Sequence, residues 1–264
     1  MADPSPPNTR CYRDLLAKPP HEVISIARDS VANGNLRNTA VTAIPYLQVG
    51  EEVKRSLLDE LLKDHSPSVI KWAVDGLAIL GGERSVQRLR DFYRETQDAA
   101  VGGETLKALA TMSDPWIVPH CAEMLQSETD TGFTLAAQAL ERLGSAEALS
   151  LLSQLLLNPS ITGLNKWLLA GLLGRHYVSA AEPFLIEAVE REEDDLLRPA
   201  HAAALANLKN RFGIRVVRDT VTAFDDDKVW VTLHIVHTFS DFRPEPGGDE
   251  RKQILAWLEG KQKE

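Results

Sequence analysis

The 264-residue sequence is poor in cysteine and contains no long run of apolar residues. Cys11 and Cys121 are its two cysteines, too few for a disulfide framework, so we expect a reducing compartment. The longest apolar stretches, such as the one around Trp167, fall well short of the ~20 residues that a membrane-spanning helix needs. The first ten residues contain no apolar signal core, so we expect a cytoplasmic protein with no membrane partner.

The sequence also lacks an excess of positive charge. It has 29 lysines and arginines against 38 aspartates and glutamates, which gives a formal net charge of −9 at pH 7. Nucleic-acid-binding proteins usually carry a basic surface, because neutralising phosphates supplies much of their affinity. The composition therefore argues against a nucleic-acid partner, although a local basic groove stays open. It suits a basic protein partner, or simply solubility.

Recognisable catalytic motifs are absent as well. The sequence has no phosphate-binding loop, dinucleotide fingerprint, zinc-protease motif or nucleophile elbow. His234 and His237 lie one helical turn apart, but no third ligand is evident, so we interpret them as helix-surface residues. The adjacent His120 and Cys121 would point about 100° apart on a helix, which favours core packing over a nucleophile and its base. We therefore predict no catalytic residue, no metal and no cofactor.

Two acidic clusters, Glu190–Asp195 and Asp225–Asp227, fall at expected helix junctions. Carboxylates at such positions cap the following helix and interact favourably with its positive end. A calcium-binding loop would need regular alternation of ligands and a glycine turn, and neither is present. We interpret both clusters as solvated caps, with a contact patch for a basic partner as the alternative.

What the sequence does contain is a repeated helical unit. In Ser66–Gly82, a Ser-Pro start and a Gly-Gly end enclose Val69, Ala73, Leu77 and Leu80, which form one apolar stripe. The same spacing of four, four and three begins again at Leu36, Val101, Gly132 and Leu197, and turn positions follow at Gly81, Ser113, Gly144 and Lys209. A further unit lies in Leu164–Gly174, where the register is open by a residue or two.

A second, shorter helix is expected after each turn, which makes a period near 31 residues with two helices in each. No convincing alternation of strand type occurs. We therefore predict an all-α fold, a right-handed α-solenoid of about six helical hairpins, because each pair exposes an apolar face that only its neighbours cover. We expect one domain over residues 1–264, with an N-terminal cap over 1–33, repeats over 34–225 and a C-terminal helical cap over 226–264.

The segments LRNTAVTAIPYL and KDHSPSVIKWAVDGLAILGG look like a consensus with an aspartate followed by V-R-x-x-A-x-x-x-L-x-x-L-G. This pattern resembles HEAT-like repeats, particularly the short ones of phycobilisome bilin lyase subunits. The consensus arginine is kept at Arg37 and Arg198, and it is replaced at Ile70, Gly102 and Phe133. The resemblance covers about residues 20–225 and implies that the first helix of each hairpin lines a concave groove. It identifies an architecture better than an activity.

Residues two, three, six and ten past the first apolar position are then expected to face the groove. The candidate partner-binding residues are Lys71, Trp72, Asp75, Glu104, Lys107, Gln138 and Arg142, with Lys166 and Trp167 from the unit of open register. Tryptophan and arginine are residue types that dominate binding hot spots. In the alternative interpretation, the two tryptophans are partly buried between helices.

The favoured function is a non-enzymatic protein–protein interaction module that binds through the groove. It would be an adaptor, or an immunity-type protein that masks a basic partner. One alternative, implied by the resemblance alone, is a bilin lyase or bilin-handling subunit. The third is a HEAT-like DNA-base glycosylase, in which Trp72, Asp75 and Trp167 would imitate the groove residues of such enzymes, and the net charge argues against it.

Overall fold

The computed structural model describes residues 10–126, 130–161, 163–175, 179–194, 197–223 and 241–263, together with Val229, His234, Val236 and His237. Within these residues the chain contains helices and no β-strand, which confirms the all-α class. No helix among them is long and apolar enough to cross a membrane. The chain divides into two compact units, unit 1 over Met1–Cys121 and unit 2 over Ala122–Glu264, and each is described by itself.

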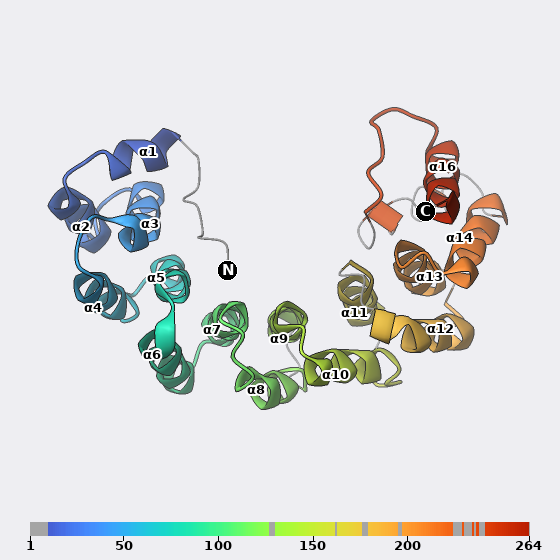
Figure 1. Ribbon diagram of the computed structural model, residues 1–264, viewed down its shortest axis with the longest axis horizontal. Helices are drawn as coiled ribbons and strands as arrows, with labels where there is room; N and C mark the ends of the chain where they lie inside the picture. Colours follow the sequence, from blue (N-terminus) through green and yellow to red (C-terminus); the bar gives the residue numbers. More distant parts are fainter. Residues whose placement is uncertain are drawn as a thin grey trace. The chain divides into compact units, whose positions relative to one another are not determined.

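Unit 1 is built from two rows of helices (Figure 1). Its elements are α1 (Arg10–Leu16), α2 (Pro20–Arg28), α3 (Gly34–Ala43), the 3-10 turn η1 (Ile44–Tyr46), α4 (Glu51–Leu61), α5 (Pro67–Leu80), α6 (Gly82–Glu95), α7 (Ala99–Thr111) and α8 (Ile117–Met124), which ends just past the unit. Helices α3, α5 and α7 pack side by side in one row, and α4 and α6 form the second row against it. Helices α1 and α2, within the segment predicted as an N-terminal cap, pack on α3.

Unit 2 repeats this arrangement (Figure 1). Its described elements are α9 (Asp130–Leu143), α10 (Ala146–Leu156), α11 (Gly163–Arg175), the 3-10 turn η2 (Ser179–Ala181), α12 (Glu182–Arg191), α13 (Leu197–Asn207), α14 (Arg211–Ala223) and α16 (Glu250–Lys263). Helix α11 packs between α9 and α13, while α10 and α12 lie behind. Helix α16 lies within the predicted C-terminal cap over 226–264. Most of the cap before residue 241 lies outside the described residues.

The turn positions of the repeat are confirmed by the backbone. Gly81, Ser113, Gly144 and Lys209 all adopt a left-handed conformation, with φ of 64°, 59°, 63° and 62°. A residue of positive φ directly after a helix lets the chain reverse and satisfies the last carbonyl groups of the helix. The two non-glycine residues among them show that this turn geometry recurs even where the side chain opposes it.

The apolar frame also matches the core. Its second and third positions are buried in each repeat: Ala40 and Ile44, Ala73 and Leu77, Thr105 and Leu109, Ala136 and Leu140, His201 and Leu205. Leu36, the first position of the first repeat, was expected in the core but is 36% exposed in the first turn of α3. Ser66 occupies the N-cap position of α5, yet its side chain makes no capping hydrogen bond. Asp64 instead accepts the Ser66 backbone N–H at 2.9 Å.

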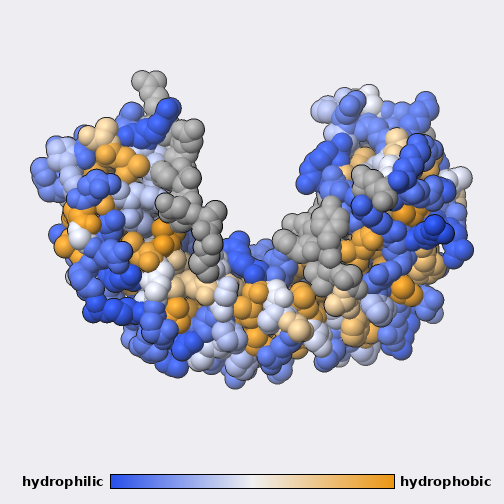
Figure 2. All heavy atoms as spheres, in the orientation of Figure 1, coloured by the Kyte–Doolittle hydropathy of each residue, from blue (hydrophilic) through white to orange (hydrophobic). Residues whose placement is uncertain are grey.

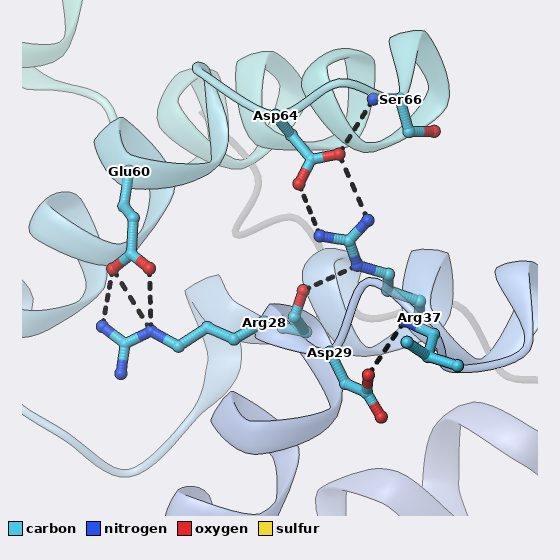
Figure 3. Close-up of polar contacts among 8 residues, drawn as sticks. Arg28, Asp29, Arg37, Glu60, Asp64 and Ser66 are labelled. Atoms are coloured by element: carbon cyan, nitrogen blue, oxygen red, sulfur yellow. Dashed lines mark hydrogen bonds and ion pairs between the residues drawn. The ribbon is translucent and has the colours of Figure 1, made fainter.

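The consensus arginine joins one repeat to the next (Figure 3). Arg37 is buried on α3, where its Nε donates to the Ala27 carbonyl at 3.0 Å and its Nη1 donates to Asp64 Oδ1 at 3.1 Å. Asp64 precedes α5, five residues before the first position of that repeat. Burial raises the pKa of Asp64, but the bonds from Arg37 and the Ser66 N–H outweigh it and hold the pKa below its usual value. Arg37 is therefore a structural link, not part of a partner-binding face.

The open register of the remaining repeat is settled by burial. Leu169 and Leu173 are fully buried on α11, which places Asn165 at the first position of the frame. Lys166 then takes the place of the consensus arginine. Its Nζ lies 3.1 Å from Glu192 Oε2, and Glu192 again stands five residues before the first position of the next repeat. The ion pair of Lys166 in unit 2 thus corresponds to that of Arg37 in unit 1.

Candidate protein-binding surfaces

Five of the candidate residues lie on neighbouring helices of unit 1, and we call them the α5–α7 surface: Lys71, Trp72 and Asp75 on α5, with Glu104 and Lys107 on α7. Glu104 receives both lysines, with Oε1 at 3.2 Å from Lys71 Nζ and Oε2 at 3.0 Å from Lys107 Nζ. Lys71 Nζ also lies 5.9 Å from the centre of the Trp72 ring. The structure therefore joins four of the five predicted residues in one connected network.

The position of Glu104 follows from the start of its helix. Asp98 caps α7, and its Oδ1 accepts the N–H groups of Ala100 and Val101 at 2.8 and 3.1 Å. This cap sets where α7 begins and turns Glu104 toward α5. Burial raises the pKa of Glu104, but its hydrogen bonds and charge interactions with Lys107 and Lys71 outweigh burial and leave the pKa below its usual value. Glu104 is therefore a carboxylate at neutral pH.

The α5–α7 surface is partly open to solvent. The side chain of Lys71 is 43% exposed, while those of Glu104 and Lys107 are each 18% exposed. Trp72 and Asp75 are half-buried, so Trp72 lies between the two expectations of a free hot spot and a packed core residue. Such a surface offers an indole face and an ordered set of charges to another molecule.

The remaining candidates belong to unit 2. Gln138 is half-buried and Arg142 is exposed on α9, whereas Lys166 and Trp167 are half-buried on α11. Lys166 and Trp167 line an open cleft of about 470 Å³, together with Gly163, Leu164, Glu192, Asp194 and Leu197. We call it the α11–α13 cleft, because its walls come from these two packed helices and the segment before α13. Leu164, at 71% exposure, is one of the few exposed large hydrophobic side chains among the described residues.

A smaller cavity of about 40 Å³, which we call the inner cavity, adjoins this cleft. It shares Lys166 and Glu192 with the cleft, and it is also lined by Leu156, Leu157, Ala188, Arg191 and His201. His201 is 1% exposed, and burial lowers its pKa to about 4, although the nearby Glu192 charge acts in the opposite direction. The imidazole is therefore neutral at pH 7.

The prediction for His120 and Cys121 is half right. Cys121 is fully buried, and burial raises the pKa of its thiol to about 12, so core packing is confirmed for this residue. His120 is only half-buried and lies on Trp116, with ring centres 3.9 Å apart.

The sequence-based search missed the aromatic and cationic cluster around Trp116. Tyr93 meets the indole edge to face at 5.7 Å, and the Arg94 guanidinium lies 5.2 Å from the centre of the Trp116 ring. Arg90 is also close and forms two hydrogen bonds to Asp114, at 2.8 and 2.6 Å. The sequence contains arginines spaced four apart on α6 and an Asp-Pro-Trp segment just before α8. Only the tertiary contact between these two segments brings their side chains together.

Hydrophobic residues appear between hydrophilic ones over both units on the face shown in Figure 2. Among the described residues, no group of three or more histidine, cysteine, aspartate or glutamate side chains is arranged to hold a metal ion. The features that distinguish the molecule are thus mixed aromatic and charged surfaces.

A family model agrees with the repeat architecture over part of the chain. Residues 22–110 match the family model of HEAT repeats, and no curated protein sequence matches the chain. A solved structure of human deoxyhypusine hydroxylase in complex with glycerol is 13% identical, with 96% of this chain and 97% of that chain covered and a TM-score of 0.40. The complex of CpcE and CpcF of phycocyanin lyase from Nostoc sp. is 16% identical, with 98% and 97% covered and a TM-score of 0.45.

An engineered protein is also similar, at 14% identity, with 92% of this chain and 72% of that chain covered and a TM-score of 0.40. The sequence-based resemblance is confirmed by the family match: this all-α chain contains HEAT repeats, over residues 22–110.

Proposed function

We propose that the chain is a non-enzymatic interaction module that binds another protein through the α5–α7 surface. HEAT repeats generally mediate protein–protein interaction, and stacked helical repeats present extended surfaces suited to it. The observation that carries the proposal is the network on α5 and α7, where Glu104 holds Lys71 and Lys107 beside Trp72. An ordered indole with fixed charges around it has the composition of a binding hot spot.

The same network suits binding for an energetic reason. Because Lys107 and Glu104 already hold each other at 3.0 Å, less side-chain entropy is lost when a partner covers them. Trp72 supplies the apolar contact, and Lys71 offers an exposed cation at its edge. The net charge of −9 supports a basic partner, of the kind that an adaptor or an immunity-type protein would mask.

The test is a pull-down from native lysate with the tagged chain, followed by mass spectrometry of the bound proteins. Trp72→Ala removes the indole of the α5–α7 surface, and Trp116→Ala removes a half-buried indole from another part of unit 1 as the matched control. We expect one stoichiometric partner that the Trp116 variant retains. The Trp72 variant should bind this partner at least about tenfold more weakly, because removing one hot-spot side chain typically costs that much affinity.

If both variants bind the partner equally well, the α5–α7 surface is not the binding site. The absence of any stoichiometric partner would contradict the interaction function itself. Circular dichroism of both variants serves as the folding control, since only a folded variant gives an interpretable loss.

A further inference from the structure

We propose that the α11–α13 cleft binds a lysine or arginine side chain from a basic segment of the partner protein. This inference rests on the proposed function, because it assumes that the chain binds another protein. It goes further by naming the chemistry of the guest and a second site, in unit 2.

The shape and walls of the cleft suit a long cationic side chain. Its volume of about 470 Å³ can hold such a group, and its apolar wall consists of Leu164, Trp167 and Leu197. The alkyl stem of lysine or arginine packs on apolar residues of this kind while its charged end stays polar. An indole also attracts a cation that lies over its face.

The charges that line the cleft favour a cation. They are one ammonium, on Lys166, and two carboxylates, on Glu192 and Asp194. Lys166 pairs with Glu192 at 3.1 Å, so the lining has one negative charge in excess. Glu190 and Glu193 are exposed in the same segment and make the surroundings of the cleft more acidic. An anionic guest would meet net repulsion here.

The inner cavity, which shares Lys166 and Glu192 with the cleft, holds a polar group without a partner in the part of the chain that the structure describes. His201 is almost completely buried, and neither of its ring nitrogens makes a hydrogen bond to any residue that the structure describes. The Ala188 backbone lies near enough to influence the ring, but no contact to it has hydrogen-bond geometry. A buried polar group without such a bond is costly, and a cavity of about 40 Å³ has room for a water molecule as its partner but not for the guest itself.

The charge state of this inner cavity is compatible with a cationic guest. A neutral imidazole adds no positive charge beside the cleft, so it does not oppose a cationic guest. Arg191 lines the same cavity, but its guanidinium forms an ion pair with Glu187. The inner cavity therefore adds no unbalanced cation that would repel the guest.

The experiment uses the full chain and two fluorescein-labelled peptides of sequence Gly-Leu-X-Leu-X-Gly. In one peptide X is arginine, and in the other it is citrulline, which has nearly the same shape and no charge. Fluorescence anisotropy at low ionic strength measures both affinities. We expect the arginine peptide to bind at least about tenfold more tightly, since the charged end interacts with the carboxylates and the indole.

Two double variants locate the effect. E192Q/D194N removes the carboxylates that line the cleft, and it keeps a side chain that can cap α13 in the place of Asp194. E190Q/E193Q makes the same change in net charge in the same segment, outside the cleft lining. We expect the first pair to lose most of the preference for arginine and the second to retain it within about twofold, because exposed charges outside a site act weakly.

Three results would overturn the inference: equal affinity for both peptides, equal loss in both double variants, or no binding of the arginine peptide. The pull-down separates its failure from that of the proposed function. If E192Q/D194N retains a partner that Trp72→Ala loses, the interaction function stands and the cleft assignment fails. If no partner is captured but the arginine peptide binds selectively, the cleft binds cations and the proposed function fails.

Discussion

The α5–α7 surface and the α11–α13 cleft each contain an ion pair between a lysine and a glutamate, but the two pairs connect different parts of the repeat. Lys71 lies two positions past the start of its frame and reaches across to Glu104 on the neighbouring first helix. Lys166 lies one position past the start and pairs with Glu192, in the segment before the next first helix. A shift of one residue, which is about 100° around a helix, separates a surface network from a link between repeats.

The largest expected effect on stability concerns the two ion pairs that join one repeat to the next, Arg37–Asp64 in unit 1 and Lys166–Glu192 in unit 2. Arg37→Ala removes a buried guanidinium and leaves the Asp64 carboxylate and the Ala27 carbonyl without their partner. We expect the free energy of unfolding to fall by about 3 kcal/mol, the cost of breaking a buried ion pair from one side. Lys166→Ala should cost less, because a single ammonium contact replaces the two-pronged one. Urea denaturation measures both, and a larger loss for Lys166→Ala would contradict the assigned correspondence.

A second difference concerns the polar residues at the second frame position. Thr105 is satisfied within its own helix, where its Oγ1 donates to the Val101 carbonyl at 2.9 Å, whereas His201 has no such bond among the described residues. The unfolded chain protonates His201 below pH ~6.5, while the folded imidazole stays neutral down to about pH 4. The folded state therefore loses up to about 3 kcal/mol of stability as the pH falls through this window.

The variant His201→Leu should remove this part of the pH dependence. It should also unfold at an equal or higher temperature at pH 7, because it removes buried polar atoms that lack partners. Thermal unfolding at pH 7 and pH 4.5 gives both values. A steep loss in acid that persists in the variant would assign the effect to other groups.

The network of the α5–α7 surface should contribute a smaller amount. Glu104→Gln removes the charge that holds Lys71 and Lys107, and we expect a loss of about 1 kcal/mol at pH 7, since the site is partly open to solvent. The pKa of Glu104 is lowered on folding, so this stability is present above its unfolded pKa and disappears as the pH falls through the folded value. The difference between wild type and variant should shrink in 0.5 M salt; a salt-independent difference would indicate lost packing instead.

The smallest expected effect lies at the turns. Ser113 and Lys209 hold a left-handed conformation that glycine adopts without steric cost, as Gly81 and Gly144 do in the same positions. We expect Ser113→Gly and Lys209→Gly each to raise the free energy of unfolding by about 0.5 kcal/mol, net of the greater freedom of glycine in the unfolded chain. A loss of stability in either variant would show that its side chain contributes more than the backbone strain costs.

Much of the local architecture could be predicted from spacing alone. The frame at Val69, Ala73 and Leu77 predicted the buried stripe of α5. Its second and third positions are buried in the other repeats too, whereas Leu36, a first position, is exposed. The candidate residues Lys71, Glu104 and Lys107 lie close enough on neighbouring helices to form ion pairs, while their role in binding stays a prediction. The register of α11 was not predictable, because leucine and glycine fill nearly every position between 168 and 174 and the stripe has no polar boundary.

Other features needed the tertiary structure for a clear reason. The inner cavity brings together His201, Lys166 and Glu192, which come from two helices and a connecting segment. The Trp116 cluster likewise joins α6 and α8, and no periodicity along either helix marks the meeting of their rings.

The sequence by itself determined the helices, their turns and the repeat, because apolar spacing and capping are local properties of the chain. Tertiary structure alone decided which lysine links two repeats, which faces solvent, and which histidine is buried without a hydrogen bond. Those outcomes depend on how neighbouring helices meet, and a rotation of one residue in a helix changes every contact that its side chains make.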